Sequence, residues 1–453
     1  MRSFEWIVFI SFLPVLVVPF VSGKWQQRWL LVAALLPVMA CLLHLIAEGW
    51  RAQMAILYAV AIMVFALRLV ARERAVSRGR AVLASVLTAL VVVFGGVFPG
   101  WLLPVVTLPE PTGPYRVGIV DRELRDESRD RRLMASVWYP AEEGGAPAPL
   151  THNPDEVMNA LADQTGLPAL LFQHLRYVTL AASESAPVLT DSDPFPILVF
   201  SHGLVGMRLQ NSSTLQELAS WGYVVVAIDH TDAAAVTVFP DGEARYYDSE
   251  RFGIPSGVEP TKDLTDERMF PVWVADQRFV YDTLETWAVH DPLLANTLDL
   301  TRIGSFGHSL GGATALEVCR VDPRCRGSVD LDGGLYGGSE THPAIRPLLL
   351  MTSADSSLDT EAVQGWNALV QSATAGAYWL ELPHSNHLSF TFSQLLSPLL
   401  APPGFDPREG LAIVDTYLRA FFETHLRGMD TPLLGPAPGN RDVRWLFAEG
   451  SPG

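Results

Sequence analysis

The sequence predicts an α/β fold with a mostly parallel central sheet, preceded by a four-helix transmembrane region. Two observations lead to this prediction. Long apolar stretches fill residues 1–106. From residue 107 onward, short apolar runs alternate with segments of helical periodicity, which is typical of buried parallel strands covered by helices on both faces. We therefore expect a transmembrane region over 1–106, a folded domain over 107–428, and an irregular Pro/Gly-rich tail over 429–453.

The transmembrane prediction depends on four apolar stretches in succession. Each approaches the length needed to cross about 30 Å of hydrocarbon at about 1.5 Å per residue. Only Arg68, near the end of the third stretch, interrupts them with a charge, so a buried charge pair is not expected. A buried core helix, or a cleaved signal peptide for the first stretch, is the alternative. The expected spans are 6–22, 29–46, 53–70 and 81–106.

Basic residues in the loops predict how these spans are oriented. The loops after the first and third spans lie on one face of the membrane, and their basic residues are Lys24, Arg28, Arg72, Arg74, Arg78 and Arg80. The positive-inside rule puts that face in the cytoplasm and the chain after residue 106 on the extracytoplasmic side. Lysine occurs only at Lys24 and Lys262, which indicates a GC-rich bacterial genome. We expect a multi-pass protein of the bacterial inner membrane.

Charge and cysteine content exclude some classes of function. Residues 1–106 carry +6, and since the whole chain carries -17, the remainder carries -23. An acidic domain of this kind repels nucleic acid. The three cysteines are too few and too scattered for a zinc site, so neither a metal nor a cofactor is expected.

Cys319 and Cys325 flank a turn at Asp322-Pro323 that can bring them within disulfide distance in an oxidising compartment.

The region after residue 107 reads as strands and helices in alternation. The expected strands are 132–140, 195–203, 223–230, 302–306, 327–334, 346–355 and 378–383, with antiparallel strands near 115–140 at the start. The expected helices are 211–221, 271–289, 310–320, 360–372 and 407–427. Residues 153–180 form a helical insert before the first central strand. This insert is interpreted as ordinary packing, with a lid or an interfacial helix as the alternatives.

The strongest chemical motif is Gly307-His308-Ser309-Leu310-Gly311. It matches a G-x-S-x-G elbow, in which a strained strand-to-helix turn raises the serine hydroxyl above the sheet. Glycines two residues to either side are needed because side chains there would collide with neighbouring backbone. Here the motif follows an expected strand and opens an expected helix. We therefore predict that Ser309 is a nucleophile.

A serine hydroxyl needs a base to remove its proton. In chains with this elbow the acid and then the histidine follow the serine. Two histidines follow the last expected strand, and His387 is favoured over His384 because it lies further out on the loop. His342, in a loop before a strand, and His425, inside the final helix, are weaker candidates.

Two aspartates are candidates for the acid. Asp332 follows one expected strand and Asp355 follows the next, so both stand at the carboxyl edge of the sheet, where functional loops gather. The residues alone do not separate them. Asp330, deeper on the same strand as Asp332, is interpreted as structural.

An oxyanion hole requires two backbone N–H groups. Leu310, directly after the nucleophile, is expected to supply one. Leu204, on the turn that Gly203 permits after an early central strand, is expected to supply the other. Three nearby histidines are expected to have structural roles: His202, His230 and His308.

These residues resemble a known family. The segments that carry the likeness are TGPYRVG (112–118), VFSHGLVGMR (199–208), ELASWGYVVVAIDH (217–230), GHSLGGAT (307–314), VDLDGG (329–334) and HLSFTF (387–392). They are similar to α/β-hydrolases related to secreted platelet-activating factor acetylhydrolase. The resemblance implies an α/β-hydrolase fold over about 107–428 and selects Asp332 as the acid. LELPHSNH also resembles the histidine loop of cutinase-like polyester hydrolases, which keeps Asp355 as the alternative and supports His387 in both cases.

The function implied is a serine carboxylic ester hydrolase with the triad Ser309, Asp332 and His387. Lipid-like esters are the expected substrates, with 1-alkyl-2-acetylglycerophosphocholine as the specific candidate and the lipid bilayer as a partner. One alternative is a carboxylesterase or polyester hydrolase on non-phospholipid esters. Others are a non-catalytic membrane sensor with a hydrolase-like domain, and a transporter, which the lack of a buried charge pair in the spans disfavours.

Overall fold

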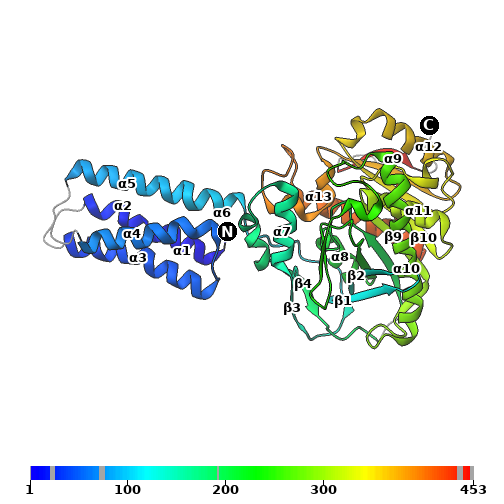
Figure 1. Ribbon diagram of the computed structural model, residues 1–453, viewed down its shortest axis with the longest axis horizontal. Helices are drawn as coiled ribbons and strands as arrows, with labels where there is room; N and C mark the ends of the chain where they lie inside the picture. Colours follow the sequence, from blue (N-terminus) through cyan, green and yellow to red (C-terminus); the bar gives the residue numbers. More distant parts are fainter. Residues whose placement is uncertain (1, 21–25, 71–76, 191–192, 436–441, 449–453) are drawn as a thin grey trace. The chain divides into compact units, whose positions relative to one another are not determined.

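The computed structural model describes residues 2–20, 26–70, 77–190, 193–435 and 442–448, and its chain divides into two compact units (Figure 1). We call them the helical unit and the sheet unit. The helical unit comprises Met1–Val106, Thr165–Tyr177 and Leu396–Pro398, and the rest of the chain forms the sheet unit. The sequence placed the whole insert in the folded domain, whereas the structure assigns Thr165–Tyr177 to the helical unit.

The helical unit contains the expected apolar helices. Their bounds are α1 (Ser3–Ser11), α2 (Leu13–Val17), η1 (Val18–Phe20), α3 (Gln26–Ala47), η2 (Ala52–Met54), α4 (Ala55–Val70), α5 (Arg78–Val92), η3 (Val93–Val97) and α6 (Phe98–Leu102). Within the described residues, four stretches are long and apolar enough to cross a membrane: Ser3–Phe20, Gln26–Ala47, Ala52–Val70 and Arg78–Leu102. This confirms the prediction of four apolar helices.

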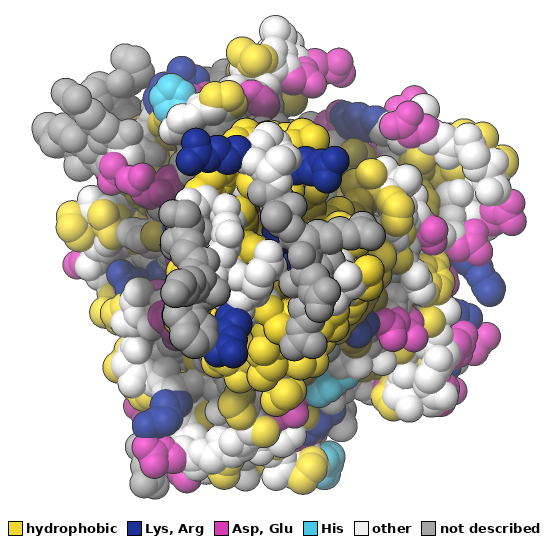
Figure 2. All heavy atoms as spheres, turned by 90° about the vertical axis from the view of Figure 1, so that its left-hand side faces the viewer, with side chains coloured by type: hydrophobic (Ala, Val, Ile, Leu, Met, Phe, Trp, Pro, Cys, Tyr) yellow, Lys and Arg dark blue, Asp and Glu magenta, His cyan; other side chains and the backbone are white. Residues whose placement is uncertain are grey.

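The helix ends carry the basic residues used to predict orientation. Figure 2 views the ends of these helices and shows mainly hydrophobic side chains, with Lys and Arg side chains among them. Arg28 and Arg78 stand near the starts of α3 and α5, and Arg68 near the end of α4, so the helix directions place them at one end of the unit. Three further basic residues of the same argument lie outside the described residues: Lys24, Arg72 and Arg74.

A buried ion pair lies just outside the expected spans, at the ends of the helices. The carboxylate of Glu5 accepts a hydrogen bond of 2.6 Å from Arg51, and both side chains are fully buried. Arg2 contacts the same carboxylate at 3.0 Å, and His44 lies 3.5 Å from Glu48 in the same network. These groups come from the start of α1, the end of α3 and the residue before η2. They therefore join helix ends instead of lining a path through the middle of the bundle.

The segment Thr165–Tyr177 packs on the same helix ends through polar contacts. Its 3-10 helix η4 (Ala169–Tyr177) contains the buried Gln173, whose side-chain oxygen accepts a 2.8 Å hydrogen bond from the Ala52 backbone N–H. The Gln173 amide nitrogen and the Tyr177 hydroxyl both donate to the Trp50 carbonyl. These bonds satisfy backbone groups at the turn between α3 and η2, which explains why part of the insert belongs to the helical unit.

The sheet unit is built on one large sheet. Among the described residues, eleven strands form it in the order β13-β12-β11-β10-β9-β5-β6-β2-β1-β4-β3. The strand bounds are β1 (Arg116–Asp126), β2 (Arg131–Ala141), β3 (Ala146–Pro149), β4 (Thr179–Glu184), β5 (Phe195–Ser201), β6 (Val224–Asp229), β9 (Leu298–His308), β10 (Cys325–Leu331), β11 (Leu348–Ser353), β12 (Ala377–Leu382) and β13 (Arg444–Ala448). A separate hairpin pairs β7 (Val236–Val238) with β8 (Ala244–Tyr246).

Strand directions confirm the predicted fold class. The six central strands, from β6 through β5, β9, β10 and β11 to β12, are parallel. β2 pairs antiparallel with both β1 and β6, as expected for the first strands. Parallel strands need helical crossovers, and the sequence supplies a helix between most successive central strands.

Helices cover both faces of this sheet. Their bounds are α7 (Pro154–Thr165), α8 (Ser212–Ser220), α9 (Lys262–Leu264), α10 (Phe270–His290), α11 (Leu310–Val321), α12 (Thr360–Ser372) and α13 (Pro407–Arg427). Val199 of β5 belongs to the same core cluster as Val280 of α10. The ring of its neighbour Phe200 lies 5.0 Å from that of Phe306, which in turn contacts Phe422 of α13. Because successive strand residues point to opposite faces, α10 and α13 lie on opposite sides of the sheet.

The prediction of an irregular tail is wrong for Arg444–Ala448. These residues form β13, which pairs antiparallel with β12 and ends the sheet. The segment is only five residues long, and it forms a strand because its backbone pairs with the edge of β12. Residues 436–441 and 449–453 of the tail lie outside the described residues.

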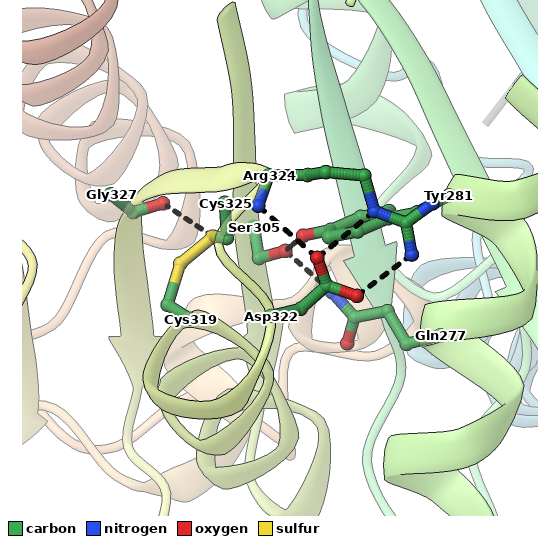
Figure 3. Close-up of a disulfide and its surroundings, with 8 residues drawn as sticks. All are labelled: Gln277, Tyr281, Ser305, Cys319, Asp322, Arg324, Cys325 and Gly327. Atoms are coloured by element: carbon green, nitrogen blue, oxygen red, sulfur yellow. Dashed lines mark hydrogen bonds and ion pairs between the residues drawn. A yellow bond between two sulfur atoms is a disulfide. The ribbon is translucent and has the colours of Figure 1, made fainter. Parts of the chain in front are cut away.

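A disulfide joins Cys319, in the last turns of α11, to Cys325 at the start of β10 (Figure 3). The two Cα atoms are 4.9 Å apart. Within the closed turn, Arg324 bonds the carboxylate of Asp322 at 2.7 Å and reaches Asp282 of α10 at 2.7 Å. The bond therefore fixes the end of the helix that follows Ser309 to the start of the strand that precedes Asp332.

Replacing both bridging cysteines by alanine should lower the thermal unfolding midpoint of the protein by several degrees. Closing so short a loop stabilises the folded state by about 2 kcal/mol in the chain-entropy picture. Differential scanning calorimetry of the full chain measures the shift. Mass spectrometry of a non-reduced digest should show the two peptides linked in protein purified from membranes. Two freely alkylated thiols would contradict the bond.

Candidate active site

Ser309 occupies the turn between the central strand β9 and the helix α11. Its backbone has φ 56° and ψ -126°, a conformation that L-residues rarely adopt. The Ser309 N–H donates a 2.9 Å hydrogen bond to the carbonyl of Leu331 on the neighbouring strand β10. The side chain is half-buried, so the hydroxyl stands at the carboxyl edge of the sheet and remains accessible. This is the strained elbow that the motif predicts.

The two glycines of the elbow are required by close backbone contacts. A Cβ atom on Gly307 would lie 2.3 Å from the carbonyl of Gly311, and one on Gly311 would lie 2.1 Å from the carbonyl of Ser201. Neither contact can be relieved by a side-chain rotation, because the opposing atoms belong to the backbone. The tight turn at Ser309 therefore depends on glycine at both positions.

Asp332 and His387 form a direct hydrogen bond. The Nδ1 atom of His387 lies 2.7 Å from Oδ2 of Asp332. Asp332 follows β10 and is buried, whereas the His387 side chain is 48 % exposed on the loop after β12. Because Asp332 occupies Nδ1, the other ring nitrogen of His387, Nε2, is left for a different partner.

The surroundings of Asp332 keep its carboxylate charged. Burial acts to raise its pKa, but the His387 hydrogen bond and its charge oppose this, and the net pKa of Asp332 lies below its usual value. The Ser353 N–H donates to Oδ1 at 2.6 Å, and the Ser356 hydroxyl donates to Oδ2 at 2.9 Å. These bonds replace the hydration that the buried carboxylate has lost.

The two aspartates weighed as the acid differ in their contacts with His387. Asp355 is exposed, and its backbone N–H donates to the carbonyl of Ser385 at 3.4 Å. Within the described part of the chain, no hydrogen bond joins Asp355 to His387. Asp330, interpreted as structural, is buried beneath the elbow, accepts a 2.8 Å hydrogen bond from the Gly333 N–H, and has its pKa raised well above the usual value by burial.

The other candidate histidines lie in different settings. His384 is exposed in a turn and has φ 56°. His342 is exposed and hydrogen-bonded to the carbonyl of Gly338. His425 lies inside α13, where burial lowers its pKa to about 4. Only His387, among the histidines weighed as the base, is hydrogen-bonded to Asp332 in the described structure.

The loop after β5 lies directly against Ser309. A Cβ atom on Gly203 would come within 3.2 Å of the Ser309 Cβ, so glycine allows this approach. Leu204 follows Gly203, and Val205 has φ 57°, which turns the chain sharply. Leu310 is the first residue of α11. The two amides expected to form the oxyanion hole thus belong to segments on either side of Ser309.

Two buried histidines fix this loop, as expected. His202 Nδ1 bonds the carbonyl of Gly203 at 2.6 Å, and its Nε2 accepts the His230 N–H at 3.1 Å. Burial lowers the pKa of His202 to about 3, so the ring is neutral. His230 stacks on Trp273 and contacts the carboxylate of Asp276 at 3.2 Å.

The sequence did not single out Gln210, which contacts several parts of the site. Its amide nitrogen lies 2.6 Å from Nδ1 of His308, and Nε2 of His308 lies 2.8 Å from the carbonyl of His387. Gln210 lies just before α8, far in sequence from both histidines. Only the packing of α8 against the loop after β12 brings these residues together, so no local pattern marked Gln210.

The TGPY segment is held by α8. The backbone N–H and the hydroxyl of Thr112 bond the two oxygens of Glu217 at 2.7 and 2.6 Å. A Cβ atom on Gly113 would lie 2.2 Å from the carbonyl of Ser220, so only glycine fits there. Thr112 and Gly113, which follow the apolar helices closely in the chain, are therefore hydrogen-bonded to α8 of the sheet unit.

Comparison with known proteins agrees with this architecture. A family model described as platelet-activating factor acetylhydrolase, isoform II, matches residues 103–253. Platelet-activating factor acetylhydrolase of Cavia porcellus is 26% identical over 358 residues, covering 72% of this chain and 79% of its own length. A probable 1-alkyl-2-acetylglycerophosphocholine esterase of Arthroderma benhamiae is 29% identical over 51% of this chain and 59% of its own.

A solved structure extends the likeness to the fold. The ferulic acid esterase from Streptomyces cinnamoneus superposes with a TM-score of 0.62 at 27% sequence identity, covering 75% of this chain and 99% of the esterase. With the parallel sheet and the serine elbow already described, this chain is an α/β-hydrolase that resembles the platelet-activating factor acetylhydrolase family.

Proposed function

We propose that this protein is a membrane-anchored serine hydrolase of lipid-like carboxylic esters, with its sheet unit on the extracytoplasmic side. The observation that carries the proposal is the 2.7 Å hydrogen bond between His387 and Asp332 in a chain that also places Ser309 on a strained elbow. Nucleophile, base and acid then follow one another in the chain order typical of α/β-hydrolases.

The proposed reaction is a two-step acyl transfer. His387 Nε2 takes the proton of the Ser309 hydroxyl as the oxygen attacks the ester carbonyl carbon. The Leu204 and Leu310 N–H groups stabilise the negative oxygen of the tetrahedral intermediate. His387 then gives its proton to the leaving alcohol, and the acyl group stays on Ser309. Water, deprotonated by His387, attacks this ester. His387 then returns the proton to the Ser309 oxygen as the carboxylic acid leaves.

Asp332 assists the base, His387, in both steps. Its charged carboxylate holds the Nδ1–H of His387 and so keeps Nε2 available to accept a proton. It also stabilises the imidazolium that forms during each proton transfer. The three donors that surround Asp332 support this role, because they hold the carboxylate rigidly and keep it ionised at neutral pH.

The substrate class is inferred from the relatives and from the apolar helices. Two relatives are named for acetylhydrolase or esterase activity on platelet-activating factor, which is 1-alkyl-2-acetylglycerophosphocholine. The helices suit a bilayer, and a tethered enzyme meets membrane lipids at high local concentration. We therefore propose short-acyl glycerophospholipids of this kind as the substrates. The ferulic acid esterase neighbour supports a second candidate, a non-phospholipid ester.

Replacing Ser309 by alanine should abolish ester hydrolysis and leave the fold intact. Loss of the nucleophile of a triad costs on the order of 10⁶ in kcat. Hydrolysis of p-nitrophenyl acetate and covalent labelling by a fluorophosphonate probe measure the effect in the full chain. Retained labelling in the variant would assign the nucleophile to another serine, and retained hydrolysis without labelling would reject a serine mechanism.

The proposed acid can be tested by a matched pair of variants. Asp332→Asn should lower kcat by about 10²- to 10⁴-fold, because the amide no longer stabilises the imidazolium. Asp355→Asn is the control, since that carboxylate is exposed on the adjacent strand end and should matter little. A larger loss for Asp355→Asn would move the acid to the loop after β11.

Separating the sheet unit from the membrane should affect lipid substrates selectively. A truncated protein that begins at Thr107 should retain hydrolysis of water-soluble p-nitrophenyl acetate. It should lose at least about tenfold more activity on short-acyl phospholipids in vesicles, because tethering no longer raises their local concentration. Equal losses on both substrates would mean that the helices serve folding, especially of Thr165–Tyr177.

Protease added to intact spheroplasts should digest the sheet unit of the full chain, and full protection would reverse the proposed orientation.

A further inference from the structure

Gln210 lies between two loops that the proposed chemistry needs. Its side-chain oxygen accepts the N–H of Gly203 at 3.3 Å, which ties it to the turn that carries Leu204. Its side-chain nitrogen donates to Nδ1 of His308 at 2.6 Å. On the far side of that ring, Nε2 of His308 bonds the backbone carbonyl of His387 at 2.8 Å. One amide and one imidazole thus connect the oxyanion loop to the histidine loop.

The partners of His308 require one tautomer of its ring. A carbonyl oxygen only accepts, so Nε2 must carry the proton that bonds His387. Nδ1 must then accept, and the amide N–H₂ of Gln210 is its donor. Burial and the nearby charge of His387 lower the pKa of His308 to about 3, so the ring is neutral and one nitrogen stays free to accept.

Neighbouring contacts leave Gln210 little freedom. A Cβ atom on Gly206 would lie 2.1 Å from the Gln210 side-chain oxygen, so the loop after β5 closes directly over it. The Gln210 carbonyl accepts the N–H of Phe392 at 3.4 Å, and the side chain of Asn211 donates to the carbonyl of Phe390 at 2.6 Å. The start of α8 is therefore bonded at several points to the segment that begins with His387.

We propose that Gln210 is a positioning residue of the active site: its amide fixes the Nε2–H tautomer of His308, and through that ring it holds the His387 backbone and the oxyanion loop in register. The proposal rests on the roles assigned above to Ser309, Asp332 and His387. In this arrangement His308, the second residue of the elbow, connects the two loops. Gln210 determines which ring nitrogen of His308 carries the proton.

Removing the Gln210 amide should slow the chemical step more than it weakens substrate binding. In Gln210→Met the side chain keeps its length but loses its donor, so His308 can move its proton to Nδ1. Its Nε2 lone pair would then face the His387 carbonyl, two acceptors would oppose each other, and the histidine loop would loosen. We expect kcat to fall about tenfold, the effect of one lost buried hydrogen bond, with KM changed less than about threefold.

A glutamate at the same position makes a sharper test. In Gln210→Glu the carboxylate accepts from Nδ1–H, which favours a doubly protonated His308 that still donates Nε2–H to His387. Raising the pH removes one proton, and the carboxylate retains the one on Nδ1, so the bond to His387 is lost. The kcat of this variant should therefore decrease at alkaline pH, whereas the kcat of the wild type should stay constant over the same pH range. The ionisable groups that face His308 are His387, Asp332 and His202, and all three are present in both proteins.

The experiment is a double-mutant cycle in the full chain with p-nitrophenyl acetate. Gln210→Met and His308→Phe should each lower kcat about tenfold, and the double variant should be no slower than the slower single one, because both act through one connection. Gln371→Met, an exposed glutamine of α12, is the matched control and should behave as wild type. Thermal unfolding midpoints, measured beside the kinetics, identify any variant that is misfolded.

Three results would overturn the proposal. These are unchanged kcat in folded Gln210→Met, independent multiplicative losses in the double variant, and a level alkaline limb in Gln210→Glu. If Gln210→Met does not fold, the pH profile of Gln210→Glu decides alone. Failure of the proposed function is distinguishable, because it would appear as hydrolysis retained in Ser309→Ala, whatever Gln210 does.

Discussion

The hydrogen bond between Asp332 and His387 is the contact on which the candidate site depends, and it constrains the order and direction of β10, β11 and β12. Asp332 directly follows β10 and His387 lies in the loop after β12, so the two residues meet only if β10, β11 and β12 run parallel and end at one edge. β11 contributes as well, since Ser353 at its end donates two bonds to the Asp332 carboxylate. A buried carboxylate is costly unless it is paired, so strand order and charge placement support each other.

Several residues with a strained backbone lie at the carboxyl edge of the sheet. Ser309, Asp332, Val205 and His384 all have φ between 56° and 57°, which is unfavourable for residues with a side chain. Such conformations cost about 1–3 kcal/mol each and persist only where the surrounding structure enforces them. At Ser309 the elbow glycines and the hydrogen bond to the Leu331 carbonyl hold this conformation. All four residues follow the carboxyl ends of parallel strands: Val205 lies in the loop after β5, Ser309 follows β9, Asp332 follows β10 and His384 follows β12.

The helical unit follows a different physical constraint. Its apolar surface suits lipid, but the turn between α3 and η2 still presents backbone groups and charges that need partners. Two carboxylates, Glu5 and Glu48, pair with Arg51 and Arg2 at these helix ends. Gln173 satisfies the Ala52 N–H. A segment inserted between β3 and β4 of the sheet unit therefore completes the polar end of the helices. This shared segment gives the two units more than one chain connection.

Local features of this protein could be predicted from sequence, and non-local ones could not. The apolar spans, the elbow at Ser309 and the alternation of strands and helices each depend on neighbours within about twenty residues. The partner of His387 could not be chosen from the residues alone, because Asp332 and Asp355 both end strands, and only the fold brings one within 2.7 Å. Strand β13, the packing of Thr165–Tyr177 on the helices, the Glu5–Arg51 pair and the position of Gln210 likewise emerged only from the tertiary structure. In each case the deciding contact joins residues at least 40 positions apart, and no periodicity or short motif encodes such a distance.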